Sequence, residues 1–501
     1  MTTTTAPSPW DEHILPTLLQ ATVQRYEQRN PRSQALHLEA AESLPGGNTR
    51  TLLHEHPFPI AIARGENHRL FDEDGHEYVD LVGEMTAGLF GHTQPVLLRA
   101  IEETARGVGL SLGAVSAAEA QYARLLCARF GLERVRFTNS GTEANLHALA
   151  AARRFTGRRM AIVFSGGYHG SVLSFGQPLS ASATTVTAAG GGGAPGNTGH
   201  VQYGTADNNV DPDTFIVLRY NDDEAVRRVF RERGPQIAAV LVEGMQGAAG
   251  FIPATPAFLF AIQEECEEAQ SVFILDEVQT SRLAPGGLQS ITFPPSSTPT
   301  PTPTPTPLRP TLTTLGKWLG GGLPFGAFGG SRAVMAVYDP STPGALAHSG
   351  TFQNNTLMLR AGRAALADVY MPAAAAAHSA RGEAFRARLN AVAEGTRIAF
   401  SGMGSLACLH VSERWGRWNK RRGDAAEAET EEGEIRSKED AGPEDEDVKT
   451  LFWLYMLERG FWVQRRGNIA LILDMPQEAL DRFVEVVVDF INDHKEGLTL
   501  K

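Results

Sequence analysis

The sequence predicts an α/β fold in which helices cover a mostly parallel sheet, joined to a smaller α/β domain. From about residue 95 onward, short apolar runs alternate with segments of helical periodicity. The apolar runs lie at residues 135–138, 160–164, 237–242 and 272–275. Strands that alternate with helices in this way form parallel sheets with both faces covered. Ligands bind beyond the carboxyl ends of such strands, and several polar or glycine-rich motifs directly follow these runs.

The composition is typical of a globular protein of two or three domains. The 501 residues are 42% hydrophobic and 20% charged. No apolar run is long enough for a membrane-spanning helix, and a net charge of −12 argues against a nucleic-acid surface. The three cysteines are scattered without metal-ligand spacing, and the first residues lack the features of a targeting segment. We therefore expect reduced thiols, a cytoplasmic location, and neither a membrane nor a nucleic-acid partner.

Four consecutive segments are expected to differ in role. Residues 1–35 are predicted to form an N-terminal polar and helical arm, and residues 36–85 the first part of the small domain. Residues 86–345 are predicted to form the large domain, and residues 346–501 the remainder of the small domain. The arm contains an amphipathic stretch from His13 to Tyr26 that is suited to a docking helix. Short β-type pieces between Ile60 and Val82 predict a hairpin or meander.

Two segments interrupt the globular pattern. Residues 293–310 contain Thr-Pro repeats, which favour an extended conformation and suit neither a strand ladder nor a helix interior. Residues 421–449 are rich in Glu, Asp, Ala and Gly, which is the composition of a disordered segment. Both are predicted to be insertions at the surface. Globular patterning resumes with a helix from Leu451 and an apolar run at 469–473.

A phosphate-binding loop is predicted after the apolar run at residues 135–138, the first of the predicted strands of the large sheet. Ser140, Gly141 and Thr142 open an alanine-rich helix. Free backbone N–H groups, hydroxyl donors and the positive end of the helix dipole suit a phosphate monoester. The alternative is an ordinary helix cap, in which Ser140 or Thr142 caps and Glu143 enriches the first turn.

A ring-stacking motif follows the next strand. Glycines flank Tyr168 and His169 in the segment 165–170. This arrangement lets a flat ring approach another flat ring, so Tyr168 is suited to stack on a pyridine. His169 is a candidate for an assisting role, and the alternative is a structural histidine.

Asp276 ends the apolar run at 272–275. A carboxylate is costly to bury there unless it is paired, and a protonated pyridine nitrogen is a suitable partner. Gln279, three residues later, is well placed for the ring's phenolic oxygen. The alternative for Asp276 is a capping or turn aspartate.

Lys317 lies among glycines in the segment 313–322. Its amine can form a Schiff base with the aldehyde of pyridoxal phosphate, and can then move a proton between substrate and cofactor carbons. Glycines allow the backbone to close around a bulky adduct. The alternative is a loop lysine beside a turn. The order of the phosphate loop, the stacking ring, the carboxylate and the lysine favours the cofactor site.

These motifs resemble those of a known family. They are Asn-Ser-Gly-Thr-Glu-Ala at 139–144, Tyr-His-Gly at 168–170, Asp-Glu-Val-Gln at 276–279, Leu-Gly-Lys at 315–317 with Gly-Gly-Gly-Leu-Pro at 320–324, and Gly-Thr-Phe at 350–352. The chain resembles class III (fold type I) pyridoxal-phosphate aminotransferases from about residue 44 to residue 473. It is most similar to the branch of glutamate-1-semialdehyde 2,1-aminomutase and the β-amino-acid transaminases.

The resemblance implies a fold type I enzyme with pyridoxal 5′-phosphate, a small-molecule amino donor and an oxo-acid acceptor. It implies that Lys317, Asp276 and Tyr168 are catalytic and that Glu243 and Val278 also contact the cofactor. It further implies a homodimer with shared active sites, in which Thr351 reaches the cofactor phosphate of the neighbouring chain.

Arginines give the clue to the substrate. The segment 44–50 resembles the part of β-amino-acid transaminases that supplies an arginine to the substrate carboxylate, and this implies such a role for Arg50. Arg466 or its neighbour Arg465 is the candidate for a second anionic contact. The alternative is a basic pair at the surface after a helix.

Two departures from the family pattern affect the pocket. Gly244 follows Glu243 where the family usually has proline, and Ser281-Arg282-Leu283 replaces a Thr-Gly-aromatic-Arg pattern. The leading hypothesis is a transaminase acting on a β-amino acid or related carboxylate-bearing amine. The alternatives are an intramolecular aminomutase, and a non-catalytic protein that presents its acidic segment to a partner.

Overall fold

The computed structural model describes residues 10–175, 212–293, 306–423 and 433–501. The chain divides into two compact units. The larger unit comprises Arg99–Ser379 and Arg436–Asp440, and the smaller unit comprises Met1–Leu98, Ala380–Ile435 and Ala441–Lys501. The predicted boundaries after residues 85 and 345 are earlier than these. At the second boundary the reason is α9 (Thr356–Ala364), which packs on α4 (Ala117–Phe130) of the larger unit.

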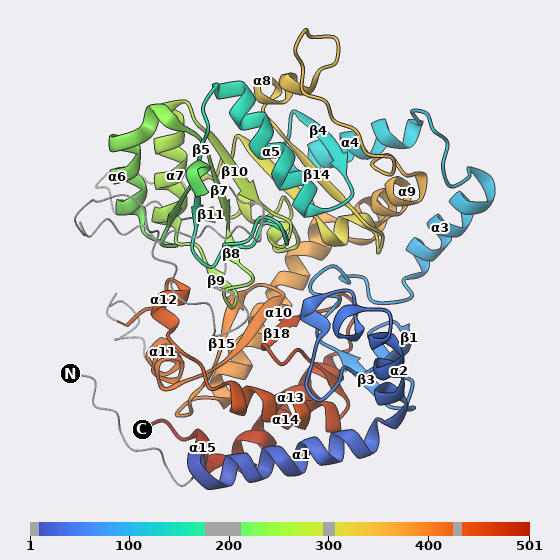
Figure 1. Ribbon diagram of the computed structural model, residues 1–501, viewed down its shortest axis with the longest axis vertical. Helices are drawn as coiled ribbons and strands as arrows, with labels where there is room; N and C mark the ends of the chain where they lie inside the picture. Colours follow the sequence, from blue (N-terminus) through green and yellow to red (C-terminus); the bar gives the residue numbers. More distant parts are fainter. Residues whose placement is uncertain (1–9, 176–211, 294–305, 424–432) are drawn as a thin grey trace. The chain divides into compact units, whose positions relative to one another are not determined.

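A seven-stranded sheet forms the centre of the larger unit (Figure 1). Its order is β4 (Arg134–Thr138), β14 (Gly326–Gly330), β13 (Leu312–Gly316), β10 (Val272–Asp276), β7 (Ile237–Glu243), β5 (Met160–Phe164) and β6 (Phe215–Leu218). β14 is antiparallel to both neighbours, whereas the other neighbouring pairs are parallel. The predicted mostly parallel α/β sheet is therefore confirmed.

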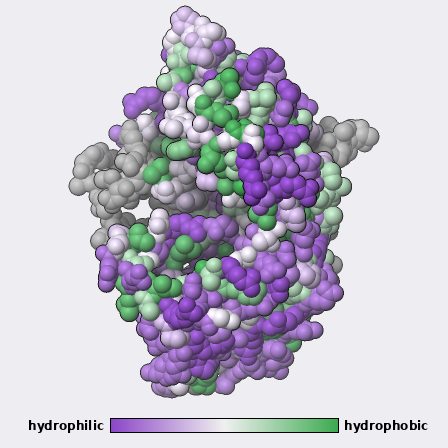
Figure 2. Space-filling view, turned by 90° about the vertical axis from the view of Figure 1, so that its right-hand side faces the viewer, coloured by the Kyte–Doolittle hydropathy of each residue, from purple (hydrophilic) through white to green (hydrophobic). Residues whose placement is uncertain are grey.

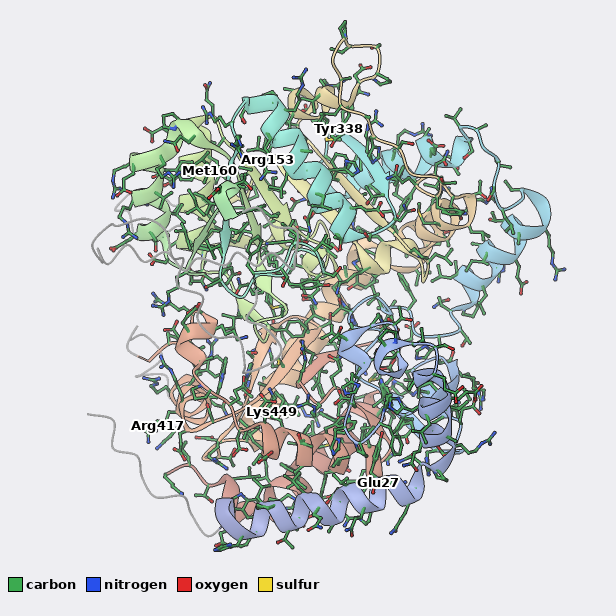
Figure 3. The ribbon with its side chains drawn as sticks, in the orientation of Figure 1. Glu27, Arg153, Met160, Tyr338, Arg417 and Lys449 are labelled. Atoms are coloured by element: carbon green, nitrogen blue, oxygen red, sulfur yellow. The ribbon has the colours of Figure 1, made fainter. Side chains whose placement is uncertain are left out.

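Helices cover both faces of this sheet. α5 (Gly141–Thr156) packs its buried alanines against alternate residues of β5 and β7, including Val163 and Leu241. On the other face, Phe164 of β5 meets Phe258 of α7 (Pro256–Ala269) with ring centroids 4.8 Å apart. Met160 at the start of β5 and Arg153 on α5 mark these layers in Figure 3. The further helices of this unit include α4 (Ala117–Phe130) and α6 (Asp223–Arg233).

The smaller unit contains two sheets around an apolar core. One sheet is β1 (Ile62–Glu66), β2 (Arg69–Asp72), β3 (Glu77–Asp80) and β17 (Phe461–Trp462); the other is β15 (Ile398–Met403), β16 (Leu406–Val411) and β18 (Asn468–Ala470). The helices include α1 (Leu15–Arg29), α2 (Pro31–Ala41), α11 (Glu413–Gly423), α13 (Glu446–Glu458) and α14 (Gln477–Asp493). Tyr26 of α1 packs on Trp453 of α13, with ring centroids 5.7 Å apart.

The structure corrects both predicted insertions in part. Residues 294–305 lie outside the described residues, but β12 (Thr306–Pro307) pairs with β11 (Thr292–Phe293) in an antiparallel ladder. The prediction that this segment builds no ladder was wrong at its end. Proline is compatible with an edge strand, where it needs no N–H donor.

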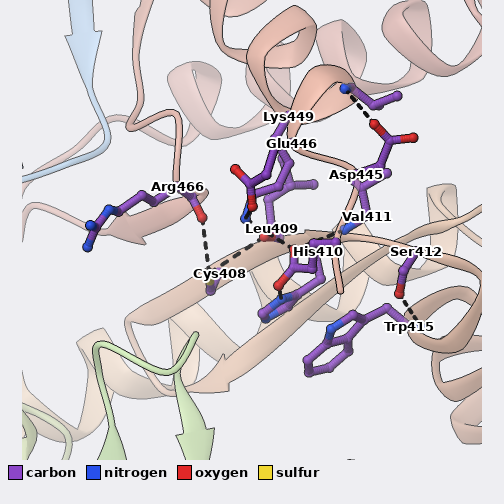
Figure 4. A network of polar contacts seen from close by, with 12 residues as sticks. Cys408, Leu409, His410, Val411, Ser412, Trp415, Asp445, Glu446, Lys449 and Arg466 are labelled. Carbon is purple, nitrogen blue, oxygen red and sulfur yellow. Dashed lines mark hydrogen bonds and ion pairs between the residues drawn. The ribbon is translucent and has the colours of Figure 1, made fainter. Parts of the chain in front are cut away.

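The acidic insertion was predicted to be disordered as far as residue 449. Residues 424–432 lie outside the described residues, whereas 433–449 contain α12 (Lys438–Ala441) and the start of α13. Glu444 pairs with His410 at 2.9 Å and with Lys449 at 3.1 Å. Figure 4 shows His410 and Lys449 within this network of polar contacts. Glu444 is thus paired both within the segment and with a strand 34 residues away, which composition alone does not reveal.

Candidate active site

Ser140 caps the helix that follows β4. Its Oγ accepts a hydrogen bond from Glu143 N at 3.2 Å, while Glu143 Oε2 accepts one from Asn139 N at 3.0 Å. The capping alternative for Ser140 is therefore confirmed. The first N–H groups of a helix have no intrahelical acceptor, so the cap is compatible with an anion at this helix end.

Glycines bring three loops into close contact at this end of the sheet. A Cβ added to Gly141 would lie 2.7 Å from Val278 Cγ2, and one added to Gly316 would lie 3.1 Å from Val278 Cγ1. Gly170 has φ +127°, and its added Cβ would lie 2.2 Å from Thr142 Oγ1. A side chain at Gly141 or Gly170 would therefore clash with Val278 or Thr142, and glycine at these positions lets the helix start pack against the segments after β10 and β5.

Asp276 lies at the centre of a buried hydrogen-bond network. In the sheet it is opposite Glu243 on one side and Thr314 on the other. Its Oδ1 accepts from Val278 N at 3.0 Å, and its Oδ2 lies 2.8 Å from His169 Nδ1. The bond to Val278 N is the turn-type contact of the alternative interpretation. The contact with His169 places that histidine directly in the site.

Asn145 is a site residue that the sequence reasoning missed. Its Nδ2 donates to Asp276 Oδ2 at 2.8 Å and to the His169 carbonyl at 3.0 Å, and its Oδ1 accepts from Thr314 Oγ1 at 2.7 Å. The signal was a single amide in an alanine-rich helix. Such a group is costly to bury unless it is hydrogen-bonded.

Glu243 supports the backbone on both sides of the site. It is buried at the end of β7, where its carboxylate accepts from Tyr168 N at 3.0 Å and from Gly247 N at 3.2 Å. Burial raises the pKa of Glu243 to about 7, and Asp276 adds to the rise while His169 opposes it. Glu243 therefore holds the segment of Tyr168, whose side chain is 42% exposed.

Lys317 begins a turn directly after the buried strand β13. Its φ of +56° lies in the left-handed region, which is costly for a residue other than glycine and is typical of functional sites. The next residue anchors the turn, because Trp318 Nε1 donates to Ser281 Oγ at 2.9 Å and its ring packs on Tyr370 at 5.0 Å. The lysine is thus held in an unusual conformation by its neighbour.

Gln279 has a buried Oε1 without a hydrogen-bond partner among the described residues. A Cβ added to Gly247 would lie 1.9 Å from this oxygen, so only glycine fits beside it. An unsatisfied buried amide is costly, and a bound ligand is one way to satisfy it.

The larger unit therefore brings together nearly all of the predicted site. Ser140, Thr142, His169, Asp276, Val278 and Glu243 are linked by the contacts above, and Gly316 connects Lys317 to them. Arg50 and Arg466 belong to the smaller unit, where Arg50 pairs with Glu84 at 2.6 Å. Thr351 lies on an exposed part of the larger unit.

Comparison with known proteins identifies the family. The family model for class III aminotransferases matches residues 53–414, which is more than half of the chain. The chain belongs to the class III aminotransferases. The β-phenylalanine transaminase of Variovorax paradoxus is 42% identical over 473 residues, covering 94% of this chain and 95% of that protein. A glutamate-1-semialdehyde 2,1-aminomutase of Sorangium cellulosum is 35% identical over 450 residues, covering 89% and 92%.

A solved structure supports the same assignment for this aminotransferase. A crystal structure of a β-phenylalanine aminotransferase from Variovorax paradoxus has a TM-score of 0.82 at 40% identity, and covers 97% of this chain and 99% of that one. The fold type I assignment is confirmed. Pyridoxal phosphate is the cofactor of this enzyme class. The helix end at Ser140, the buried carboxylate of Asp276, the strained Lys317 and the unsatisfied Gln279 oxygen all fit that cofactor.

Proposed function

We propose that this aminotransferase moves an amino group between a β-amino acid, or a related carboxylate-bearing amine, and a 2-oxo acid. The proposal rests on the guanidinium of Arg466, which has no hydrogen-bond or ion-pair partner among the described residues. The 42% identity to a β-phenylalanine transaminase over 94% of this chain supports a β-amino acid. The aminomutase relative is less similar, at 35% identity.

The two adjacent arginines of the turn before β18 differ in their partners. Arg465 Nε lies 2.9 Å from Glu55 Oε2, and its Nη1 lies 3.6 Å from Glu446 Oε2. The guanidinium of Arg466 has no hydrogen-bond or ion-pair partner among the described residues, and burial lowers its pKa. In Figure 4 its side chain extends away from His410, and only its carbonyl takes part in the network. We therefore assign the anionic contact to Arg466 rather than Arg465.

Each residue of the large-unit site has a role toward the cofactor in this proposal. Ser140, Gly141 and Thr142 would hold the phosphate at the start of α5, and Tyr168 would stack on the ring. Pyridoxal phosphate, when bound, supplies an electron sink for the charge that develops at the substrate carbon.

The remaining residues hold or move protons. Asp276 would keep the proton on the ring nitrogen, because its buried carboxylate needs a cationic partner. Asn145 and His169 fix the orientation of that carboxylate, and Gln279 Oε1 would accept a hydrogen bond from the phenolic O–H. Lys317 would bind the cofactor covalently through Nζ, and the released amine would move the proton at the substrate carbon.

The proposal includes a homodimer in the cytoplasm. Val115 is 86%, Phe352 60% and Leu110 54% exposed, and hydrogen bonds join their segments: Asn355 Nδ2 donates to the Leu110 carbonyl at 3.3 Å. Figure 2 shows hydrophobic side chains gathered among hydrophilic ones on the side of the molecule that carries α3 (Pro95–Gly107). Exposed apolar patches of this kind mark interaction sites.

Thr351 precedes Phe352 in that exposed segment, which supports its predicted reach to the neighbouring chain's phosphate. The cytoplasmic location is supported by Cys127, Cys266 and Cys408, which are all free thiols. Within the described residues, no helix combines the length and apolar character needed to cross a bilayer.

The direct test is a substrate panel. The purified holoenzyme is offered β-amino acids, α-amino acids and amines without a carboxylate, each with pyruvate or 2-oxoglutarate. The proposal predicts amino transfer from β-amino acids, and predicts that Arg466→Gln raises the KM for acid substrates. Arg465→Gln is the matched control, because it removes the same charge at the adjacent position. Isomerisation without an added oxo acid would instead favour the aminomutase.

A further inference from the structure

A left-handed turn lies directly after the strand β3 of the smaller unit. Gly83, Glu84, Met85 and Thr86 have φ values of +50°, +47°, +53° and +78°. A positive φ is uncommon even for a single residue other than glycine, and three such residues in succession are rarer still. Strain of this kind persists only where the surroundings hold the backbone in place.

The turn is held firmly at both of its ends. Asp80 Oδ1 accepts hydrogen bonds from Val82 N at 2.8 Å and from Gly83 N at 3.0 Å. Gly88 N donates to the Gly83 carbonyl at 2.8 Å, which closes the loop on itself. Ala470 N in turn donates to the carbonyl of Leu81, just before the turn, at 2.7 Å. These hydrogen bonds therefore fix the backbone of the turn, and with it the place of the side chains that the turn carries.

Glu84 is the charged residue of this left-handed turn. Its Oε1 lies 2.6 Å from Arg50 Nη1, while 55% of the Glu84 side chain and 48% of the Arg50 side chain remain exposed. The ion pair is therefore partly open to solvent on both sides.

Arg50, by contrast, belongs to a segment held by short-range bonds. Gly47 N donates to the Leu44 carbonyl at 2.8 Å, and Leu53 N donates to the Arg50 carbonyl at 2.8 Å. Gly46 and Gly47 both have positive φ, +72° and +74°. The backbone around Arg50 is therefore held by bonds within its own segment, whereas the turn of Glu84 is also bonded to Asp80 and Ala470.

We propose that Glu84 is an internal competitor of the substrate: its carboxylate occupies Arg50 until a substrate carboxylate displaces it. This inference rests on the proposed function and on the role that the family resemblance implies for Arg50, namely binding the carboxylate of the amino donor, with Arg466 as the second anionic contact. A guanidinium donates two parallel hydrogen bonds along one edge to a carboxylate, and Glu84 takes the edge that contains Nη1. A substrate carboxylate that binds along this edge displaces Glu84. Acids bind less tightly than they would to a free arginine, whereas ligands without a carboxylate leave the ion pair intact.

The test uses Glu84→Gln, which keeps the shape and removes the charge. Because exposed ion pairs contribute little, we expect the KM for a β-amino acid to fall by about twofold to fivefold, with kcat unchanged. The inhibition constant of 3-phenylpropanoate, a carboxylate without an amine, falls by the same factor. That of the neutral 3-phenylpropanamide stays unchanged. Glu84→Gly serves as a second variant, because glycine suits the left-handed turn and protects the fold.

The controls separate this inference from the proposed function. Glu66→Gln removes the carboxylate of another exposed pair in the same unit, Arg64–Glu66 at 3.0 Å, and leaves both constants unchanged. In an Arg50→Gln background, Glu84→Gln has no further effect. If Arg50→Gln itself leaves the KM for acids unchanged, Arg50 has no substrate role and the proposed function is wrong at this residue. If Arg50→Gln raises that KM but Glu84→Gln fails to lower it, only the competition is overturned.

Discussion

The contact between Asn145 and Asp276 gives a prediction with a calculable pH dependence. Asn145→Asp is nearly isosteric, but it replaces the Nδ2 donor, 2.8 Å from Asp276 Oδ2, by a second carboxyl group. Two buried carboxylates at this distance cannot both be ionised at low cost, so one pKa rises strongly. The new group must keep its proton in order to remain a hydrogen-bond donor.

The magnitude follows from linkage between protonation and folding. If burial and the neighbouring charge raise the pKa of the new carboxyl group by about 3 units above its unfolded value of about 4, the cost is about 4 kcal/mol of unfolding free energy. The sign is fixed, because the native state binds the proton more tightly than the unfolded chain. The unfolding free energy of the variant relative to wild type is therefore highest below pH 4, and it falls as the pH rises toward about 7.

The assay is urea unfolding of wild type and Asn145→Asp between pH 4.5 and 8. We expect the difference in unfolding free energy to grow by about 1.4 kcal/mol per pH unit inside that window. Amino-transfer activity of the variant should fall over the same window. Parallel stability curves for the two proteins would refute the reasoning, since the two side chains would then not be in contact.

Two further predictions concern packing and a distant ion network. Gly170→Ala should weaken pyridoxal phosphate binding at least about tenfold, as measured by equilibrium dialysis, because the new Cβ would lie 2.2 Å from Thr142 Oγ1. Gly157→Ala is the control, because Gly157 has a similar positive φ of +70° but no atom within 4 Å of an added Cβ, and this variant should bind the cofactor normally. Glu444→Gln should cost about 1 to 2 kcal/mol of unfolding free energy at pH 7, because burial opposes the charged imidazole and Glu444, together with Cys408, raises the pKa of His410 to about 9, so the variant loses only the part that Glu444 supplies. That stabilisation is full below the unfolded pKa of His410 and is lost as the pH rises through 9, so the difference between the two proteins should shrink above pH 9 to the contribution of the Lys449–Glu444 pair.

The sequence predicted the part of the sheet that is built from apolar runs. Strand β5 has the predicted bounds 160–164, and β7 and β10 each extend one residue further, to Glu243 and Asp276. These strands are buried on both faces, so hydrophobicity alone marks them. The motifs that follow them could be placed because parallel strands bring their carboxyl ends together.

Strand β14 could not be predicted from hydrophobicity. It reads Gly-Ala-Phe-Gly-Gly, and an added Cβ on Gly326 would lie 2.0 Å from the Ser140 carbonyl oxygen. Its glycines are therefore required by the close approach of neighbouring backbone, which is a tertiary property. Asn145 escaped prediction for a similar reason, because its partners lie on three other segments.

The arginines show the limit of motif reasoning at the substrate side. Arg465 and Arg466 are indistinguishable in sequence, and only the positions of Glu55 and Glu446 separate them. The carboxylate of Glu84 likewise became a candidate only when the left-handed turn placed it against Arg50.

Borohydride reduction followed by peptide mass spectrometry shows directly whether Lys317 carries the cofactor. The account predicts a visible cofactor band that reduction removes, with the phosphopyridoxyl mass fixed to the peptide containing Lys317. Lys317→Ala should bind the cofactor only reversibly and should lose amino transfer. A label on another lysine, or transfer at the native rate by Lys317→Ala, would contradict the account.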